Sequence, residues 1–305
     1  MKKFAKYILI VLLGVVLIDL VVRAIFTFTY SHVPENAELR QRYKYELNKD
    51  TAEVLIIGAS RAMFCYKPSI LQDSLGMTVY DDGLDGVGVI GQYLSVKNAI
   101  DKGGLKIVIY DLCSLQLTYE WNQNKISAYY PYYWKDKNVR EVVDDCNSKA
   151  KWMLCSALYQ YNSCWHDIVR TFFQKKYHDR GYEELPYTGK VWKPQYWDEK
   201  DIAFVPDPWA EKYLDKIVKL CKDNDVKLVI TMAPGLGSGF RSSALYLTDY
   251  CAKHGIPFWD FTELEELHHD SKYFRDYNHI NSEGVKIFTP VLAHKLKTYI
   301  LSESY

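Results

Sequence analysis

A serine, an aspartate and a histidine stand where they could form a nucleophilic triad. Ser60 follows an apolar run, residues 55–57, and Gly58, at a point where a strand would end and a helix could begin. Asp276 and His279 lie three residues apart near the end of the sequence. A serine hydroxyl needs an imidazole to take its proton and a carboxylate to orient that imidazole. We therefore predict Ser60 as nucleophile, His279 as base and Asp276 as the orienting acid.

These motifs resemble the SGNH (GDSL-like) hydrolase family. Gly58-Ala59-Ser60 stands where that family has Gly-Asp-Ser, and Asp276-x-x-His279, followed by Ile280-Asn281-x-x-Gly284, matches its last motif. The resemblance implies that the N–H groups of Ser60 and Gly83 stabilise the oxyanion of an acyl-transfer reaction. It covers about residues 53–111 and 226–300.

Two of the family's intermediate motifs are altered. Asp81 replaces a frequent asparagine ahead of Gly83, and after the third predicted strand the family's Gly-x-Asn is replaced by Asp111-Leu112-Cys113-Ser114. In the family that asparagine is the third oxyanion donor, and losing one such donor costs about two to three decades in rate. The reaction is then slow, or absent, or another donor such as Ser114 takes the place of the asparagine.

The neighbours of Ser60 test competing interpretations. An α/β-hydrolase nucleophile elbow needs Gly-x-Ser-x-Gly, but Ala62 occupies the last place. Arg61 lies at a predicted helix start, where the helix dipole disfavours a cation, so it needs an anionic partner. That partner is a structural carboxylate such as Asp85, or an acidic group of a substrate that Arg61 binds.

The adjacent His268 and His269 lack the spacing of metal ligands on a helix face, so we expect no metal and no cofactor.

The surrounding elements alternate between strand and helix. Strands are predicted at residues 53–57, 78–81, 107–110, 227–232 and 256–259, and helices at residues 68–75, 90–101, 208–224, 243–254 and 282–301, the last capped by Ser282. Such alternation predicts a three-layer α/β/α fold with a central parallel sheet, of the SGNH or flavodoxin type. The carboxyl ends of its strands would bring Ser60, Gly83 and the 276–279 turn together.

An insertion at about residues 114–206 leaves this pattern. It holds most of the tryptophans and the aromatic cluster 129–134. Aromatic faces stack on sugar rings, so the insertion could cap a carbohydrate site; it could equally form its own small core or rest on a membrane interface. Cys146, Cys155 and Cys164 could include a disulfide outside the cytoplasm, with buried free thiols as the alternative.

The N-terminal residues 1–32 are predicted to be an uncleaved membrane anchor of the domain at residues 33–305. Lys2, Lys3 and Lys6 precede an apolar stretch long enough for a bilayer core of about 20 residues, without a small-residue cleavage pattern. Asp19 and Arg23 interrupt it, but four residues apart on a helix they can pair. The alternative is an amphipathic helix docked on the domain. The lysines favour a cytoplasmic N-terminus and hence an extracytoplasmic domain.

Composition and anchor together narrow the function. The 38 basic and 38 acidic residues leave no net charge, which argues against a nucleic-acid partner. We expect a serine esterase or O-acyltransferase that acts on acyl, chiefly acetyl, esters of cell-envelope carbohydrate. Membrane-anchored relatives, as the resemblance implies, have an integral membrane acyltransferase as partner. The alternative is a catalytically silent SGNH-fold scaffold that binds a polysaccharide or such an acyltransferase.

Overall fold

The chain forms two compact units in the computed structural model. Unit 1 combines Met1–Arg40 with Ile126–Lys175, and unit 2 combines Gln41–Lys125 with Lys176–Tyr305. The residues that the structure describes are 2–32, 51–118, 126–162, 173, 179–190, 193, 204–236, 241–267 and 270–302. The predicted boundaries of anchor, domain and insertion stay predictions.

Unit 2 is built on a five-stranded parallel sheet. Its strands are β1 (Val54–Gly58), β2 (Val79–Asp81), β3 (Ile107–Asp111), β4 (Lys227–Met232) and β5 (Phe258–Asp260), in the order β2-β1-β3-β4-β5. This is the flavodoxin-like order. Gly58 pairs with Asp111, and Asp111 with Thr231, so the carboxyl ends of the three central strands lie level. Residues that follow these ends therefore meet at one edge of the sheet.

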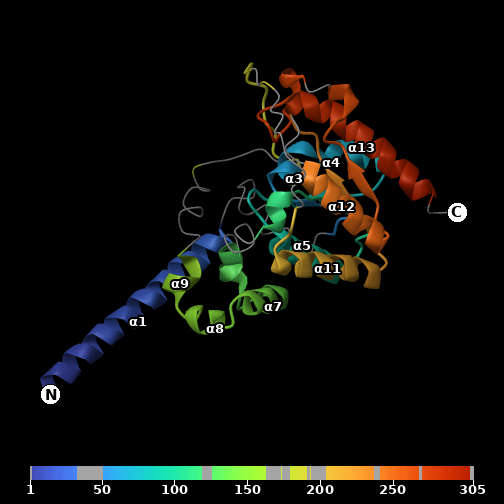
Figure 1. Cartoon of the computed structure of the whole chain (residues 1–305). Coiled ribbons are helices and arrows are strands. Elements are labelled where there is room, and N and C mark those ends of the chain that lie inside the picture. The colour runs from blue at the N-terminus through green and yellow to red at the C-terminus, as the bar shows by residue number, and fades with distance from the viewer. Residues whose placement is uncertain are drawn as a thin grey trace. The chain divides into compact units, whose positions relative to one another are not determined.

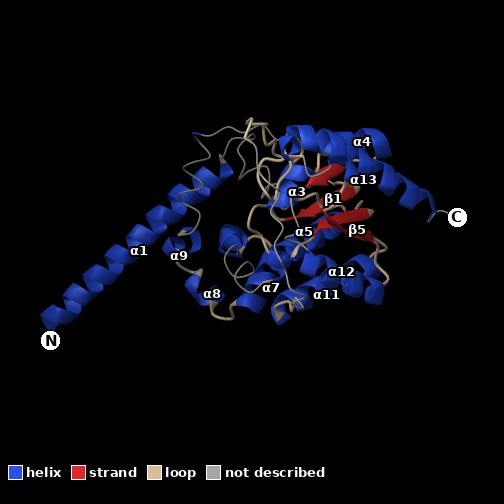
Figure 2. Cartoon of the chain, turned by 45° about the horizontal axis from the view of Figure 1, so that its top comes forward, coloured by secondary structure: helices blue, strands red, loops and turns tan. Residues whose placement is uncertain are grey.

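Helices cover both faces of this sheet, as Figures 1 and 2 show. One face carries α4 (Pro68–Leu75), α13 (Ser282–Ser302) and the short α3 (Ser60–Cys65); the other carries α5 (Val89–Lys102), α11 (Pro208–Asp223) and α12 (Arg241–His254). Every residue of β1 and β3 is buried, as their continuous apolar sequences require between two helical layers. The three-layer fold with a parallel sheet is confirmed.

The start of α13 corrects one detail of the sequence analysis. The cap is Asn281, not Ser282: the Asn281 side-chain oxygen accepts from the N–H groups of Glu283 at 2.9 Å and Gly284 at 3.2 Å. Its amide also donates to the Lys272 carbonyl at 2.7 Å, and the side chain is fully buried. An amide with both a donor and an acceptor satisfies both partners, whereas a serine one residue later begins the helix itself.

Unit 1 contains the long helix α1 (Lys2–Ser31) and short helices from the insertion. These are η2 (Ile126–Tyr132), α7 (Lys137–Cys146), α8 (Ala150–Met153) and α9 (Ala157–Tyr161). Three tyrosines of the aromatic cluster, Tyr129, Tyr130 and Tyr133, are buried, and Tyr130 stacks on Tyr159 with ring centroids 5.8 Å apart. For these three side chains the alternative of a small core holds.

Helix α1 and the cysteines bear on the predicted anchor and disulfide. Over Lys2–Thr29 the helix is long and apolar enough to cross a membrane, a character that a signal sequence shares. Asp19 and Arg23 form the predicted i,i+4 ion pair at 3.7 Å.

Of the three cysteines considered for a disulfide, Cys146 and Cys155 are free thiols, whereas Cys164 lies outside the described residues.

Candidate active site

A sharp turn after β1 presents Ser60. Gly58 has φ of +152°, and a Cβ there would lie 2.7 Å from both the Ala62 Cβ and the Asp111 carbonyl oxygen. Only glycine fits this turn without displacing its neighbours. Helix α3 starts at Ser60, so the Ser60 N–H belongs to the first turn and has no partner within the helix. The Ser60 residue is half-buried and therefore open to a reactant.

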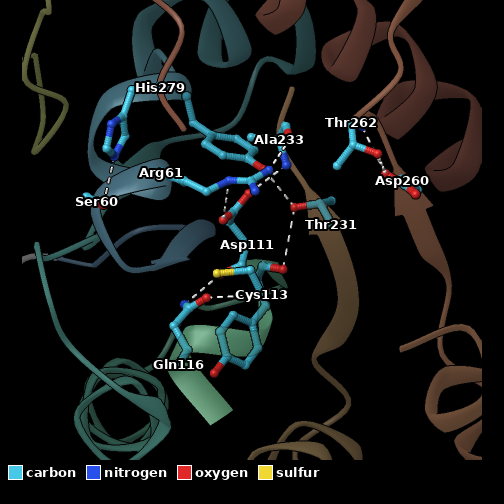
Figure 3. A network of polar contacts seen from close by, with 12 residues as sticks. Ser60, Arg61, Asp111, Cys113, Gln116, Thr231, Ala233, Asp260, Thr262 and His279 are labelled. Atoms are coloured by element: carbon cyan, nitrogen blue, oxygen red, sulfur yellow. Dashed lines mark hydrogen bonds and ion pairs between the residues drawn. The ribbon is translucent and has the colours of Figure 1, made fainter. Parts of the chain in front are cut away.

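Ser60, His279 and Asp276 form a hydrogen-bonded chain (Figure 3 shows the first contact). His279 Nε2 lies 2.9 Å from Ser60 Oγ, and His279 Nδ1 lies 2.9 and 3.0 Å from the two Asp276 oxygens. The Phe64 ring meets the imidazole edge to face, with centroids 5.4 Å apart. An antiparallel bridge between Phe274 and Ile280 closes the turn that carries Asp276 and His279. The structure thus brings together the three residues predicted from their spacing.

The carboxylate of Asp276 is held in its ionised form. Burial by itself raises its pKa, but the hydrogen bond and charge of His279 and the N–H groups of Asn278 and His279 together outweigh burial. Those N–H groups donate to Asp276 Oδ1 at 2.8 and 3.0 Å. The net pKa lies below the ordinary value. An anionic Asp276 orients the imidazole with Nδ1 protonated and leaves Nε2 to accept the serine proton.

Gly83 lies against α3, but its N–H already has an acceptor. A Cβ on Gly83 would lie 2.5 Å from the Met63 nitrogen, so the glycine packs tightly on the helix that carries Ser60. The Gly83 N–H donates to Asp81 Oδ1 at 2.8 Å, and Asp81 is fully buried. The predicted oxyanion role of Gly83 therefore requires the Asp81 carboxylate to share or release this N–H.

Arg61 is tied to Asp111, which corrects the partner expected for it. Its Nε lies 3.6 Å from Asp111 Oδ1, and its guanidinium also donates to the Ala233 carbonyl (Figure 3). Arg61 is 4% exposed, so the structure favours the structural carboxylate over a group of the substrate. The carboxylate is Asp111 and not Asp85, because the register that pairs Gly58 with Asp111 puts β3's last residue beside the start of α3.

Asp111 is the centre of a buried polar network. Its Oδ2 accepts from the Tyr66 hydroxyl at 2.7 Å and the Ala233 N–H at 2.8 Å, and the Tyr66 hydroxyl also lies 2.9 Å from Thr231 Oγ1. Asp111 stands one residue past the β3 end predicted from the sequence, where the family's third motif begins. Here it links the start of α3 to β4 instead of facing a substrate.

Ser114 begins the turn η1 (Ser114–Leu117) that follows β3. The Gln116 side chain fixes this turn: its amide donates to the Asp111 carbonyl at 2.9 Å, and its oxygen accepts from the Cys113 N–H at 2.7 Å (Figure 3). The role of Ser114 as an oxyanion donor stays a prediction.

Sequence reasoning missed a segment that braces the site. In residues 179–185, the Arg180 carbonyl accepts from the Asp81 N–H at 2.9 Å, the Glu183 N–H donates to the Met63 carbonyl at 3.0 Å, and the Leu185 carbonyl accepts from the Ser282 N–H at 2.8 Å. The segment thus contacts β2, α3 and α13. The sequence of this segment has no helical or strand periodicity. The one sequence signal for it was Asp81, a charged residue at the end of a predicted buried strand, which needs a polar partner from elsewhere in the chain.

Comparisons with known proteins find distant structural likenesses. No protein-family model matches the chain, and no curated protein matches it by sequence. A candidate acylhydrolase from Bacteroides fragilis has 13% identity over 85% of this chain and 96% of its own, with a TM-score of 0.42. A candidate lipolytic protein of the G-D-S-L family from Desulfitobacterium hafniense has 10% identity over 79% and 98%, with a TM-score of 0.43. A candidate platelet activating factor from Streptococcus pneumonia has 12% identity over 92% and 98%, with a TM-score of 0.38. The second is described with the family name that the motifs of this sequence resemble, and all three are too distant to transfer an activity.

Proposed function

We propose that this protein is a serine-dependent ester hydrolase or acyltransferase. The observation that carries the proposal is the chain from Ser60 Oγ to His279 Nε2 and from His279 Nδ1 to Asp276, with each contact at 2.9 to 3.0 Å. These distances are short enough for a nucleophile to transfer its proton to its base. The half-buried Ser60 at the carboxyl end of β1 stands where open parallel sheets bind their ligands.

The mechanism has two acyl-transfer steps. Ser60 Oγ attacks the ester carbonyl while His279 Nε2 takes its proton, and the imidazolium then protonates the leaving alkoxide. The acyl group is left on Ser60. In the second step His279 deprotonates water or a sugar hydroxyl, which attacks the acyl carbonyl; the bond to Ser60 Oγ breaks, and the imidazolium returns the proton to Ser60 Oγ. The Ser60 N–H at the start of α3 is available to the oxyanion, and the Gly83 N–H joins it once Asp81 shares it.

The finer part of the proposal concerns substrate and place. We propose that the substrates are acyl esters, chiefly acetyl esters, of cell-envelope carbohydrate. We also propose that unit 2, which carries Ser60, lies outside the cytoplasm and that an integral membrane acyltransferase is its partner. Support comes from α1, since a retained anchor keeps an enzyme beside a membrane-linked polymer. A soluble hydrolase for diffusing esters would need no such helix.

Hydrolysis of p-nitrophenyl acetate by the full chain in detergent tests the chemistry. Ser60→Ala is expected to lower kcat by at least about three decades, as removal of a triad nucleophile does. Ser69→Ala on α4 is the matched control, because it deletes a hydroxyl outside the triad and is expected to keep wild-type activity. Equal rates for wild type and Ser60→Ala in folded protein would refute the hydrolase and leave a dedicated acyltransferase or a catalytically silent protein as the better account.

A catalytically silent scaffold is the second candidate, and specific contacts favour it. The Asp81 carboxylate holds the Gly83 N–H, and Asp111 lies in a buried ion pair at the start of the segment 111–114 that replaces the motif with the family's third oxyanion donor. In this case the folded chain would show no Ser60-dependent turnover of any acyl ester, yet it would be retarded in affinity electrophoresis through an acetylated polysaccharide.

A further inference from the structure

Two charged residues within α1 are held by the turn between α8 and α9. The Ser156 hydroxyl donates to Asp19 Oδ1 at 2.6 Å, and the Leu158 N–H donates to the same oxygen at 3.1 Å. Arg23 donates to the Cys155 carbonyl at 2.6 Å and to Gln160 Oε1 at 3.4 Å. Asp19 therefore acts as an anionic cap for the first turn of α9, while Arg23 donates to a backbone carbonyl between α8 and α9.

The backbone of that turn is satisfied from within the protein. The N–H groups of Leu154 and Ser156 donate to the carbonyls of Ala150 and Met153 at 2.8 and 3.1 Å. The Leu154 carbonyl accepts from the Trp134 indole at 3.0 Å, and the Cys155 carbonyl from Arg23. Non-helical backbone at membrane depth is tolerated only when such polar groups have protein partners. The turn meets that requirement at each of these groups.

The length of α1 places Asp19 and Arg23 at membrane depth. A hydrocarbon core of about 30 Å takes about 20 helical residues at 1.5 Å each, so a span that starts after Lys6 ends near residue 26. Asp19 then lies about 10 Å, and Arg23 about 5 Å, inside the far boundary of the core, and tilt puts them deeper. Charges at this depth need partners, which the residues 155–160 supply.

The outer side of the same turn is apolar and exposed. Trp152 is 72% exposed, Leu158 45% and Met153 40%, and the Lys151 ammonium lies 5.1 Å from the Trp152 ring centroid. Apolar side chains with a tryptophan and a lysine are typical of segments that rest in the interface of a bilayer. Phe26 stacks on the buried Tyr161 with ring centroids 5.2 Å apart, so α9 packs directly against α1, whose own apolar side chains are exposed along most of its length.

We propose that residues 150–161 form a membrane-embedded clamp on α1. The clamp lies at the far boundary of the hydrocarbon core that α1 spans and reaches about 10 Å into it, binds Asp19 and Arg23 on its inner side, and turns Trp152, Met153 and Leu158 toward lipid. The partner of this surface is the bilayer itself. The proposal requires α1 to be retained in the mature chain and is independent of any catalytic role of Ser60.

Fluorescence quenching in vesicles tests the clamp. The full chain is reconstituted into phosphatidylcholine vesicles whose acyl chains carry bromine near the headgroup end, and its emission is compared with that in unbrominated vesicles. The difference in emission between wild type and Trp152→Phe gives the emission of Trp152. We expect this emission to be less than half as strong in the brominated vesicles as in the unbrominated ones. The control is Trp259→Phe: Trp259 lies in β5 and is 8% exposed, so the emission that it contributes is expected to stay unquenched.

Two results would overturn the clamp. If the bromines quench Trp152 no more than they quench Trp259, the turn lies away from lipid. An intact mass of the membrane-extracted chain that lacks residues 1–32 would show that α1 is a removed signal sequence. Because neither readout involves ester hydrolysis, failure of the clamp is distinguishable from failure of the proposed catalysis.

Discussion

Replacing Asp111 with asparagine should destabilise unit 2 strongly, although it changes few atoms. Asp111 is 1% exposed and pairs with Arg61, which is 4% exposed. Asparagine removes the negative charge and leaves the Arg61 guanidinium buried without its counter-charge. The one oxygen of asparagine can take the place of Asp111 Oδ2, which accepts from both Tyr66 and Ala233, so the negative charge is the main loss.

The magnitude follows from the geometry. Two unit charges at the observed 3.6 Å attract by about 5 kcal/mol at an effective dielectric constant of about 20. Breaking a buried ion pair by removing one partner costs about 3–5 kcal/mol, because the remaining charge stays buried. We expect Asp111→Asn to lower the free energy of unfolding of unit 2 by about 4 kcal/mol.

Hydrogen exchange resolves this loss within the full chain. Amides of β1 and β3 report the opening of the sheet, so their protection gives the free energy of unfolding of unit 2 alone. A double-mutant cycle of Asp111→Asn and Arg61→Met then isolates the pair, and we expect a coupling of at least about 2 kcal/mol. A coupling under about 0.5 kcal/mol would refute the claim that the ion pair anchors α3.

Two further predictions concern the catalytic groups. Because the folded-state pKa of Asp276 lies below its ordinary value, its contribution to stability is complete above about pH 4 and is lost as the pH falls through the folded-state pKa. Thermal melts of Asp276→Asn should therefore fall below those of wild type at neutral pH and converge with them in strong acid, while kcat at neutral pH drops by about four decades; a stability difference that persists in acid would contradict this. Asp81→Asn keeps an acceptor for the Gly83 N–H but removes a buried negative charge near the expected oxyanion, so ester hydrolysis should rise by about tenfold. Unchanged or slower hydrolysis by folded Asp81→Asn would mean that Gly83 does not serve the oxyanion.

The strands and helices of unit 2 were predictable because local signals mark them. Residues 68–75 form a helix as expected, since Pro68 opens it and Gly76 ends it in the left-handed conformation with φ of +68°. The strands lie within two residues of their predicted bounds, and β1 and β3 are marked most clearly, as apolar runs rich in β-branched residues that end at Gly58 and Asp111. Once the sheet is parallel, its strand ends share an edge, and the meeting of Ser60 with His279 follows from topology.

The partners of buried polar groups were not predictable, since they depend on register. Asp85 is near Arg61 in sequence, but the pairing of Gly58 with Asp111 decides which carboxylate reaches the guanidinium. The same holds for Asp81 and Gly83, whose contact depends on a three-residue turn. The short helices α8 and α9 were missed because they lie among aromatic residues without a clear period. Helix α7 does carry a local signal that was not used, since Asp136 caps it and Val139, Val142 and Val143 share one buried face.

Helix α3 explains why residues outside the motifs matter to the proposed reaction. Six residues are too few for a helix to be stable by itself, so contacts with the rest of unit 2 must hold it. Arg61 ties its first turn to β3 and β4, and the Glu183 N–H binds the Met63 carbonyl in its middle. A displacement of about 1 Å at a nucleophile costs about two decades in rate. In the proposed site Asp111 therefore fixes Ser60 relative to His279, from the first position of the segment that replaces the family's third motif.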